Sequence, residues 1–436
     1  MSETPLVSVI VPTHDRAAML RRGLDALRAQ TYPAERTEVL VVADGCTDGT
    51  SEMARRYQVP FRLRSISQPH DGAAAARNLG AAQTRGTLLI FLDDDVEAAP
   101  DLVAAHVEAH RRRPGGVVIG RLPPVLGEQR GFFRIALRRW WEAKFDALAI
   151  LGHRFHAFDL LSGNFSLGAD LFARCGGFDP SLRCHEDYEL GVRLMQSGVP
   201  FLYAPDALGS HHEGTDLRRA LRRKCEEGQA DVQIGRRHPD LRRALPLARL
   251  RPGRSARSRL FFRLAFVRPA AGDAAAGAAA RTLDLLERLR LRFRWRRLLD
   301  DLLSYWYWRG VAQELPTAAE LARFLPAASS TPAPEIEVDL RAGIVHAQRQ
   351  LDEARPGAVR LRLGPQPLAR ILPQPGAEPL RGEHLLPLLG THLARPLLRA
   401  LAQDGAIAPP FNVEQLLAFC ALPPRYDLGD HGIVLD

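Results

Sequence analysis

The stretch that decides the fold is Phe91-Leu92-Asp93-Asp94-Asp95, in which three acids end an apolar run that begins at Leu88. The apolar run predicts a buried strand. Asp93 and Asp95 are two residues apart, so they lie on the same side of an extended chain. Two carboxylates on one side suit Mg²⁺ or Mn²⁺ that also holds a diphosphate. Acids are equally favoured where a polar turn leads into a helix. The neighbouring segments must decide between these two interpretations.

Strands alternate with helices before the acidic stretch. We expect strands over residues 7–11, 38–43, 61–66 and 87–92, and helices over residues 16–30, 51–57 and 71–83. This alternation predicts parallel βαβ units, in which ligands bind beyond the carboxyl ends of the strands. Three of these ends are polar, namely Thr13-His14-Asp15, Asp44-Gly45 and Asp93-Asp94-Asp95. We therefore expect the three ends to lie side by side.

Two side chains near these strand ends have both a functional and an ordinary interpretation. Asp44 precedes Gly45 and is placed to accept the N3–H of a pyrimidine base, or else forms a solvated turn. Arg77 follows an Ala-rich run and is placed to meet a phosphate, or else lies on the surface. The residues alone leave both alternatives open.

A second polar cluster follows later in the chain. Gly163-Asn164 is suited to form a tight wall of a pocket. Glu186-Asp187 opens a predicted helix, where the helix macrodipole alone would favour carboxylates. His211 follows a short predicted strand and is either a neutral imidazole ligand to a metal or a surface residue.

The composition is ordinary for a soluble globular protein, and the charge balance is basic. A chain of 436 residues suggests two or three domains, and 46% hydrophobic with 25% charged residues is ordinary for globular proteins. The net charge of +9 is compatible with nucleic acid, an anionic membrane surface or anionic small substrates. The five cysteines form no CxxC pair, which argues against a disulfide framework or a zinc site and fits a reducing cytosol. We expect neither a secretory signal nor a membrane span.

Six segments in order resemble the motifs of family 2 glycosyltransferases with the GT-A fold, over roughly residues 6–215. The segments are Val7-Ser8-Val9-Ile10-Val11-Pro12-Thr13, the turn from Val41 to Thr50, Arg77-Asn78-Leu79-Gly80, Phe91-Leu92-Asp93-Asp94-Asp95, Ser162-Gly163-Asn164-Phe165-Ser166 with Gly176-Gly177-Phe178-Asp179, and His185-Glu186-Asp187. Each segment is weak alone, but their order and spacing make the resemblance specific. Ala43 and Cys46 depart from the family pattern, which leaves the preference for a base open.

The resemblance implies an α/β fold of the GT-A type, with a Rossmann-like, mostly parallel mixed sheet flanked by helices. By family likeness, the nucleotide pocket is lined by the strand end at residues 12–13, the base meets Asp44, and Asp187 is the general base. The expected site comprises a catalytic residue, Asp187; substrate-binding residues Pro12, Thr13, Asp44, Arg77, Asp94, Gly163, Asn164 and Glu186; and metal ligands Asp93, Asp95 and His211.

The implied reaction is attack by an acceptor hydroxyl on an anomeric carbon, with loss of a nucleoside diphosphate. A neutral hydroxyl is a poor nucleophile, so Asp187 would take its proton as the bond forms. A metal held by Asp93 and Asp95 would neutralise the leaving diphosphate. A single base on the face opposite the leaving group implies single displacement with inversion. We expect the transferred group to be a hexose. The expected partners are a nucleotide-sugar, preferably a UDP-sugar, and a glycan or lipid-linked acceptor of the cell envelope.

Two other functions are compatible with parts of the sequence. A nucleotidyltransferase also handles diphosphates and metal, but it would be expected to have a Gly-rich basic loop after the first strand, where this chain has Pro12-Thr13-His14-Asp15-Arg16. A non-catalytic nucleotide-sugar-binding or assembly protein would tolerate loss of Asp187 or of the acidic triplet, and neither is lost.

We expect residues 1–215 to form the glycosyltransferase domain, 216–325 a basic amphipathic helical extension, 326–335 a linker, and 336–436 a small α/β domain of unknown function. The extension mixes Arg with aromatic residues, which suits an anionic membrane surface or, alternatively, a packed helical subdomain with solvated Arg. No nucleic-acid-binding motif is present, so nucleic acid is not expected as a partner. We therefore expect a cytoplasmic protein, peripheral on the inner face of the cell membrane.

Overall fold

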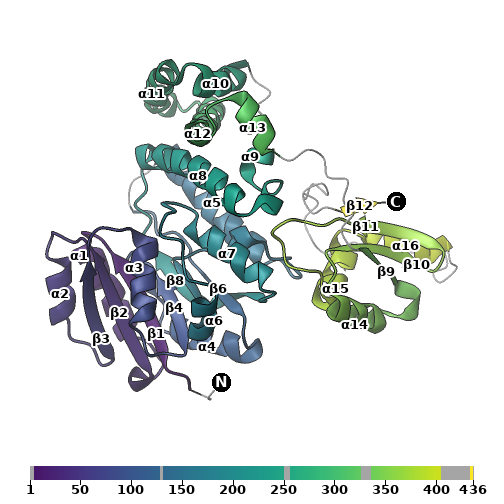
Figure 1. Cartoon of the computed structure of the whole chain (residues 1–436), viewed down its shortest axis with the longest axis horizontal. Helices are drawn as coiled ribbons and strands as arrows, with labels where there is room; N and C mark the ends of the chain where they lie inside the picture. The colour runs from purple at the N-terminus through teal and green to yellow at the C-terminus, as the bar shows by residue number, and fades with distance from the viewer. Residues whose placement is uncertain (1–3, 128–130, 250–255, 326–334, 404–432, 436) are drawn as a thin grey trace. The chain divides into compact units, whose positions relative to one another are not determined.

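The computed structural model describes residues 4–127, 131–249, 256–325, 335–403 and 433–435 (Figure 1). The chain divides into two compact units. The first comprises residues 1–149 and 157–326, and the second comprises residues 150–156 and 327–436. The domain boundaries expected from the sequence stay a prediction. The expected linker lies outside the described residues except for Glu335.

The first unit is built on a mixed sheet with the strand order β3-β2-β1-β4-β7-β6-β8-β5. Its strands are β1 (Val7–Thr13), β2 (Thr37–Asp44), β3 (Arg62–Gln68), β4 (Leu88–Leu92), β5 (Val96–Ala98), β6 (Val117–Arg121), β7 (Asn164–Gly168) and β8 (Phe201–His211). The pairs β1–β2, β2–β3, β1–β4 and β6–β8 are parallel, whereas β7 runs antiparallel to β4 and β6, and β5 to β8. This confirms the predicted mixed, mostly parallel α/β sheet.

The strand β1 lies between β2 and β4, which brings three polar strand ends to one edge of the sheet. Thr13 is opposite Ala43 of β2, and Ile10 is opposite Phe91 of β4. All three strands are buried along their length, as expected for parallel strands covered on both faces. The expectation that the polar ends lie side by side is therefore confirmed.

Helices cover this sheet: α3 packs on β1 and β2, and α4 packs on β8. The helices associated with the sheet are α1 (Ala17–Arg28), α2 (Thr50–Arg56), α3 (Ala73–Ala82), α4 (Leu102–Arg112), α5 (Phe132–Leu148), α6 (Ala169–Arg174) and α7 (Glu186–Gln196). The first three lie where the sequence predicted helices, with ends that differ by a few residues. The elements β5, β6, β7, α5 and α6 were not predicted.

The remaining helices of the first unit are α8 (Leu217–Arg237), α9 (Pro246–Arg249), α10 (Ala256–Val267), α11 (Pro269–Arg288), α12 (Arg292–Glu314) and α13 (Ala318–Phe324). The helices α8 and α12 cross very closely, since a Cβ at Gly228 would collide with the Tyr307 carbonyl oxygen and one at Gly310 with the Cys225 carbonyl oxygen. Tyr305, Tyr307 and Trp308 are buried in this helical core. These aromatic side chains, which suggested a lipid surface in the sequence, are therefore packing residues. In the described part of the chain, no helix is both long and apolar enough to cross a membrane.

The second unit is small and of the α/β class, as predicted. Its sheet has the order β12-β11-β10-β9, with β9 and β10 parallel and the other pairs antiparallel. Its elements are β9 (Glu335–Asp339), α14 (Ile344–Ala354), β10 (Ala358–Leu363), β11 (Gln366–Ile371), α15 (Gly382–Thr391), α16 (Ala394–Gln403) and β12 (Ile433–Leu435). The segment 150–156 belongs to this unit, and the Phe155 N–H donates to Glu378 Oε1 at 3.0 Å.

Candidate functional site

Asp94, the middle acid of the triplet, ties the end of β4 to β1. It is buried, and its Oδ2 accepts the Thr13 hydroxyl at 2.7 Å while its Oδ1 lies 3.0 Å from Arg16 Nη1. Burial raises the pKa of Asp94 to about 6, against the opposite effect of the Arg16 charge. Asp94 was expected to bind substrate, but the structure uses its oxygens for internal contacts. Thr13 is likewise engaged by Asp94, and Pro12 is buried within β1.

Arg16 lies over the acidic triplet and was not anticipated from the sequence. The Nη1 atom that contacts Asp94 is also 2.9 Å from Asp95 Oδ2, and the side chain remains one-third exposed. Arg16 therefore offsets two carboxylate charges while keeping access to solvent. Its position three residues beyond Thr13, in the loop after β1, is the only signal by which the sequence would have indicated it.

Asp95 and His211 bring a carboxylate and an imidazole together beside the triplet. His211 Nε2 is 3.5 Å from Asp95 Oδ1, and the His211 ring meets the edge of Trp141 at 4.9 Å. Burial pushes the pKa of Asp95 upward, but hydrogen bonding and charge from His211 and Arg16 bring it below its ordinary value. Within the described residues, the buried His211 Nδ1 has no hydrogen-bond partner, and the buried Asp95 Oδ1 has only the long 3.5 Å contact with His211 Nε2. Such orphaned atoms fit ligation of a divalent cation.

The described residues contain no group of three His, Cys, Asp or Glu side chains already arranged to hold a metal ion. Asp93 is the third expected ligand, and its side chain is one-third exposed and paired with Arg77. A set of oxygen ligands with one imidazole suits Mn²⁺, whereas Mg²⁺ is suited by the oxygen ligands alone. The donor chemistry therefore fits the expected cation, although the side chains do not form a closed site.

Arg77 joins the acidic triplet to the second carboxylate cluster. Its side chain extends from α3 and is almost completely buried, with Nη2 2.7 Å from Asp93 Oδ1 and Nη1 2.9 Å from Glu186 Oε1. The guanidinium also lies over the Phe178 ring, 5.4 Å from its centroid. Arg77 was expected to meet a phosphate, but the structure places it as a bridge between the end of β4 and the start of α7. Glu186 is accordingly a partner of Arg77.

Asp187 occupies the first turn of α7, next to Glu186. Its Oδ2 accepts the Ser162 N–H at 3.1 Å, and its Oδ1 accepts the Tyr188 N–H at 2.9 Å. Burial and the adjacent Glu186 charge raise the pKa of Asp187. A carboxylate whose pKa is raised towards neutrality is a better proton acceptor for an attacking hydroxyl. The two backbone hydrogen bonds fix its orientation.

His185 connects the start of α7 to the helical core. It has a left-handed backbone with φ 59°, and its Nδ1 is 2.9 Å from Asp231 Oδ1 on α8, while the Tyr307 hydroxyl of α12 donates to Asp231 Oδ2 at 2.5 Å. All three side chains are buried. Burial lowers the pKa of His185, but the hydrogen bond and charge of Asp231 outweigh it and raise the pKa. The helical core therefore braces the residue that precedes Glu186-Asp187.

Gly163 and Asn164, predicted together as a pocket wall, are placed differently. A Cβ at Gly163 would lie 3.0 Å from Asp93 Oδ2, and the Gly163 carbonyl accepts the Asp93 N–H at 3.2 Å. Gly163 therefore borders the acidic triplet. Asn164 is fully buried, with Oδ1 2.9 Å from His106 Nε2 and Nδ2 donating to the Ala207 carbonyl at 2.8 Å. Its carboxamide is used in the core and does not face the carboxylates.

A chain of buried hydrogen bonds continues from Asn164 to two histidines of α4. His106 Nε2–H donates to Asn164, its Nδ1 is 2.8 Å from Ser166 Oγ, and His110 Nε2 is 2.8 Å from the same Ser166 atom. Burial lowers the pKa of both histidines to about 4, for His110 with a further contribution from His106. Both imidazoles are therefore neutral in the native protein near pH 7.

We expect the free energy of unfolding to fall as the pH is lowered from about 6.5 to about 4 because of these histidines. The unfolded chain takes up protons below pH 6.5, whereas the native imidazoles do so only near pH 4. At pH 5 each histidine should lower the free energy of unfolding by about 2 kcal/mol relative to its value at pH 7.5. Denaturant unfolding at the two pH values measures this. The free energy of unfolding should depend more steeply on pH in wild type than in His110→Gln. The variant His346→Gln, at an exposed histidine, is the control and should behave as wild type does. Equal slopes in all three proteins would contradict the prediction.

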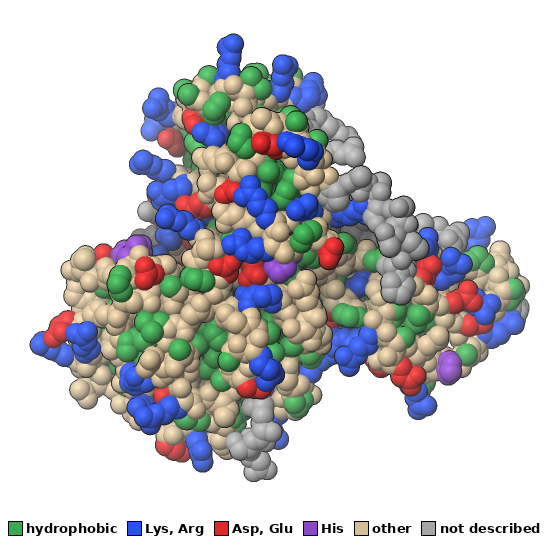
Figure 2. Space-filling model, viewed as in Figure 1, with side chains coloured by type: hydrophobic (Ala, Val, Ile, Leu, Met, Phe, Trp, Pro, Cys, Tyr) green, Lys and Arg blue, Asp and Glu red, His purple; other side chains and the backbone are tan. Residues whose placement is uncertain are grey.

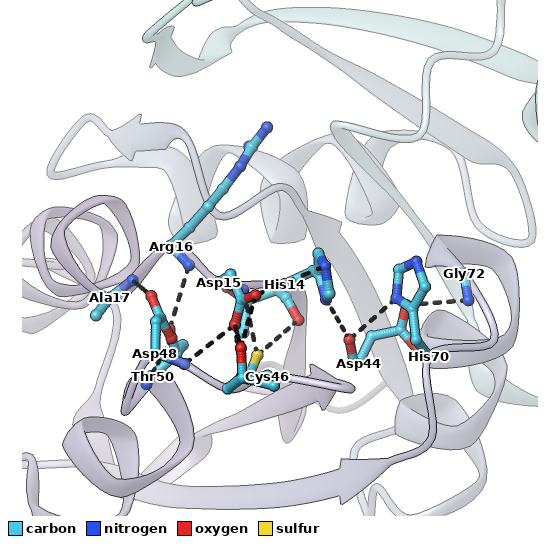
Figure 3. A network of polar contacts seen from close by, with 12 residues as sticks. His14, Asp15, Arg16, Ala17, Asp44, Cys46, Asp48, Thr50, His70 and Gly72 are labelled. Atoms are coloured by element: carbon cyan, nitrogen blue, oxygen red, sulfur yellow. Dashed lines mark hydrogen bonds and ion pairs between the residues drawn. The ribbon is translucent and has the colours of Figure 1, made fainter.

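Asp44 belongs to a polar network that joins the loops after β1, β2 and β3 (Figure 3). Its buried carboxylate is contacted within 3.0 Å by four groups, the Gln68 amide, the Asp71 and Gly72 N–H groups and the His70 ring. A carboxylate accepts about four hydrogen bonds, so a base at Asp44 would have to replace one of these partners. His70, with 61% of its side chain exposed, is the partner that solvent or a ligand reaches.

The same network fixes the first loop. Asp15, at φ 48°, accepts the Thr47 N–H at 2.6 Å and the Asp48 N–H at 3.2 Å. Gly45, at φ 66°, packs against His70, where a Cβ would lie 2.7 Å from His70 Cβ. The loops that follow β1 and β2 therefore form one unit beside the acidic triplet.

The known proteins to which this chain is similar are glycosyltransferases. Residues 8–173 match the family model described as glycosyl transferase family 2. The chain is 34% identical over 242 residues to validoxylamine A glucosyltransferase of Streptomyces hygroscopicus subsp. jinggangensis, covering 49% of this chain and 57% of that relative. It is 27% identical over 241 residues to pre-mycofactocin glycosyltransferase of Mycobacterium tuberculosis, covering 54% of this chain and 48% of that relative. The chain thus spans about half the length of these curated relatives.

A solved structure to which this chain is similar is a mannosyltransferase from Pyrobaculum calidifontis in complex with GDP-Man and Mn²⁺. The TM-score is 0.45 and the sequence identity 23%, over 70% of this chain and 86% of that one.

Proposed function

We propose, from the match of residues 8–173 to the model of glycosyl transferase family 2, that the chain transfers a sugar from a nucleotide-sugar donor to an acceptor hydroxyl, by single displacement with inversion. In support of this, Asp93 and Asp95 follow β4, and Arg77 joins Asp93 to Glu186, the neighbour of Asp187. The donor is proposed to be a UDP-sugar, and the transferred group a hexose.

The observation that carries the proposal is the bridge made by Arg77. The acidic triplet ends a strand, and Glu186-Asp187 opens a helix more than 90 residues later. One buried guanidinium, paired to Asp93 at 2.7 Å and to Glu186 at 2.9 Å, holds the two clusters together. A donor diphosphate at the triplet and an acceptor hydroxyl at Asp187 would then be close enough to react.

The protein residues divide the chemistry between them. Asp187 accepts the hydroxyl proton, and the Ser162 and Tyr188 N–H groups hold its carboxylate in place. Arg16 stands beside the triplet as a partly exposed cation that would face developing negative charge. A Mg²⁺ or Mn²⁺ ion, when held by Asp93, Asp95 and His211, would supply electrophilic stabilisation of the leaving diphosphate.

The acceptor and the cellular role are further parts of the proposal. We propose a glycan or a lipid-linked acceptor, in synthesis of cell-envelope polysaccharide or glycoconjugate. A cytoplasmic location, peripheral on the inner face of the membrane, would bring the chain to such an acceptor. The excess of basic residues, with a net charge of +9, supports association with an anionic surface.

Release of nucleoside diphosphate tests the proposed reaction. The chain is incubated with separate UDP-, GDP-, ADP- and dTDP-sugars in MnCl₂ or MgCl₂, with and without simple glycoside acceptors. We expect release from a UDP-sugar, and its loss when EDTA removes the cation. Release of pyrophosphate from a nucleoside triphosphate and a sugar phosphate would instead identify a nucleotidyltransferase. Saturable donor binding without any turnover would identify a non-catalytic binding protein.

A further inference from the structure

The turn between α11 and α12 presents alternating apolar and basic side chains to solvent. Residues 288–294 have the sequence Arg-Leu-Arg-Leu-Arg-Phe-Arg, and every one of them is exposed. Phe293 is 87% exposed and Leu289 is 58% exposed, while Leu285, one helical turn earlier, is 56% exposed. We call residues 285–294 the basic-apolar turn. Exposed apolar residues gathered in one place mark an interaction surface.

The basic residues of this turn are available to an anionic partner. Within the described residues, the guanidinium groups of Arg288, Arg290, Arg292 and Arg294 make no ion pair, whereas Arg296, one turn into α12, pairs with Asp300 at 3.1 Å. Figure 2 shows basic side chains projecting at the top of the view, over the helices α10–α12, with hydrophobic side chains among them. Cations interleaved with leucine and phenylalanine match a bilayer interface, where phosphates lie above acyl chains.

Backbone hydrogen bonds and contacts with α5 hold the basic-apolar turn in place. The Leu291 N–H bonds to the Leu286 carbonyl at 2.8 Å, and Arg290 has a left-handed backbone that closes the turn. Phe132, the first residue of α5, donates its N–H to Glu287 Oε1 at 2.8 Å and packs its ring 5.5 Å from Trp295. The exposed residues are therefore held on a packed base.

The helix α5 connects this turn to the candidate active site. Trp141, on the same helix as Phe132, contacts the His211 ring at 4.9 Å and donates to Glu213 Oε2 at 3.1 Å. Nine helical residues at about 1.5 Å per residue separate Phe132 from Trp141 by roughly 14 Å. The helix α5 therefore joins the base of the turn to the side chains beside His211.

We propose that the basic-apolar turn docks the protein on an anionic lipid bilayer, with Leu289, Leu291 and Phe293 in the interface and the four arginines at the headgroup phosphates. The inference rests on the proposed function only in that docking would present a bilayer-held acceptor to the site. Nucleic acid is the less suitable partner, because single strands are bound by stacking on successive aromatic rings, and Leu289 and Leu291, two of the three apolar side chains, provide no stacking surface.

Co-sedimentation with lipid vesicles tests the proposal. Wild type is expected to sediment with vesicles of phosphatidylcholine and phosphatidylglycerol, but not with phosphatidylcholine alone, and to be released by salt. Leu291→Ser/Phe293→Ser and Arg288→Gln/Arg290→Gln/Arg292→Gln/Arg294→Gln should each weaken binding by at least about tenfold. Val345→Ser, which removes a 62% exposed apolar side chain from α14, is the matched control and should bind as wild type does.

The outcomes separate docking from catalysis. All variants should keep the thermal stability of wild type and the same release of nucleoside diphosphate from a soluble donor. Failure of wild type to bind the anionic vesicles, or unchanged binding of both turn variants, would overturn the docking proposal even if the donor is turned over. So would a result in which the arginine variant loses binding to a single-stranded oligonucleotide but not to vesicles. Absence of turnover with intact vesicle binding would contradict the proposed function alone.

Discussion

Replacement of Asp187 by asparagine is expected to lower kcat for sugar transfer by roughly 10²- to 10⁴-fold, the range that a positioned general base contributes. The substitution preserves shape and leaves one oxygen to accept a hydrogen bond from Ser162 or Tyr188, but it removes the proton acceptor. Affinity for the donor should change little, because the donor is assigned to the acidic triplet that follows β4. Single-turnover transfer and donor-induced thermal shift measure the two quantities separately.

A matched carboxylate tests whether this effect is specific. Asp170→Asn removes a carboxylate from the helix α6 that is 74% exposed and paired only with Arg174 within the described residues. We expect this variant to transfer sugar as wild type does. A rate for Asp187→Asn within about threefold of the control would remove Asp187 from the mechanism, and a large loss of donor affinity in Asp187→Asn would assign it to binding.

The position of the acidic triplet was predictable because the signals that define it are local. Strand patterns, the helices between them and the polar residues at their ends lie within the first 95 residues, and the parallel order of consecutive strands brings those ends together. The sequence could not predict what each side chain does there. Asp94 and Asp95 are adjacent, yet one is turned to Thr13 and the other to His211, 116 residues away in the chain.

Contacts between segments far apart in the chain account for the other features that the sequence did not predict. His185 meets Asp231 across 46 residues and Asp231 meets Tyr307 across 76, so neither contact has a local signal in the chain. Tyr305, Tyr307 and Trp308 of α12 resemble a lipid-facing surface in composition, but burial against α8 and α10 decides that they are core. The exposed residues that suit a lipid surface lie where α11 ends and α12 begins. Periodicity gives the faces of a helix without indicating which face is covered.

Replacement of Arg77 by alanine is expected to destabilise the protein by about 3–5 kcal/mol, because it leaves Asp93 and Glu186 without their buried partner. The cavity left over the Phe178 ring adds to this cost. Since the bridge also sets the separation of the two carboxylate clusters, sugar transfer should be lost even under conditions where the variant is folded. Denaturant unfolding gives the first quantity, and transfer measured below the unfolding midpoint gives the second.

Two further variants decide whether the bridge, rather than positive charge alone, is what matters. Arg77→Lys keeps one cation but has a single nitrogen, which cannot donate the paired contacts that the two Nη atoms make with Asp93 and Glu186. It should recover part of the stability and little of the transfer rate. Arg85→Ala, at an exposed arginine after the same helix, should change neither quantity. Full recovery of the transfer rate by Arg77→Lys would mean that a cation between the clusters is sufficient and that the forked geometry has no role.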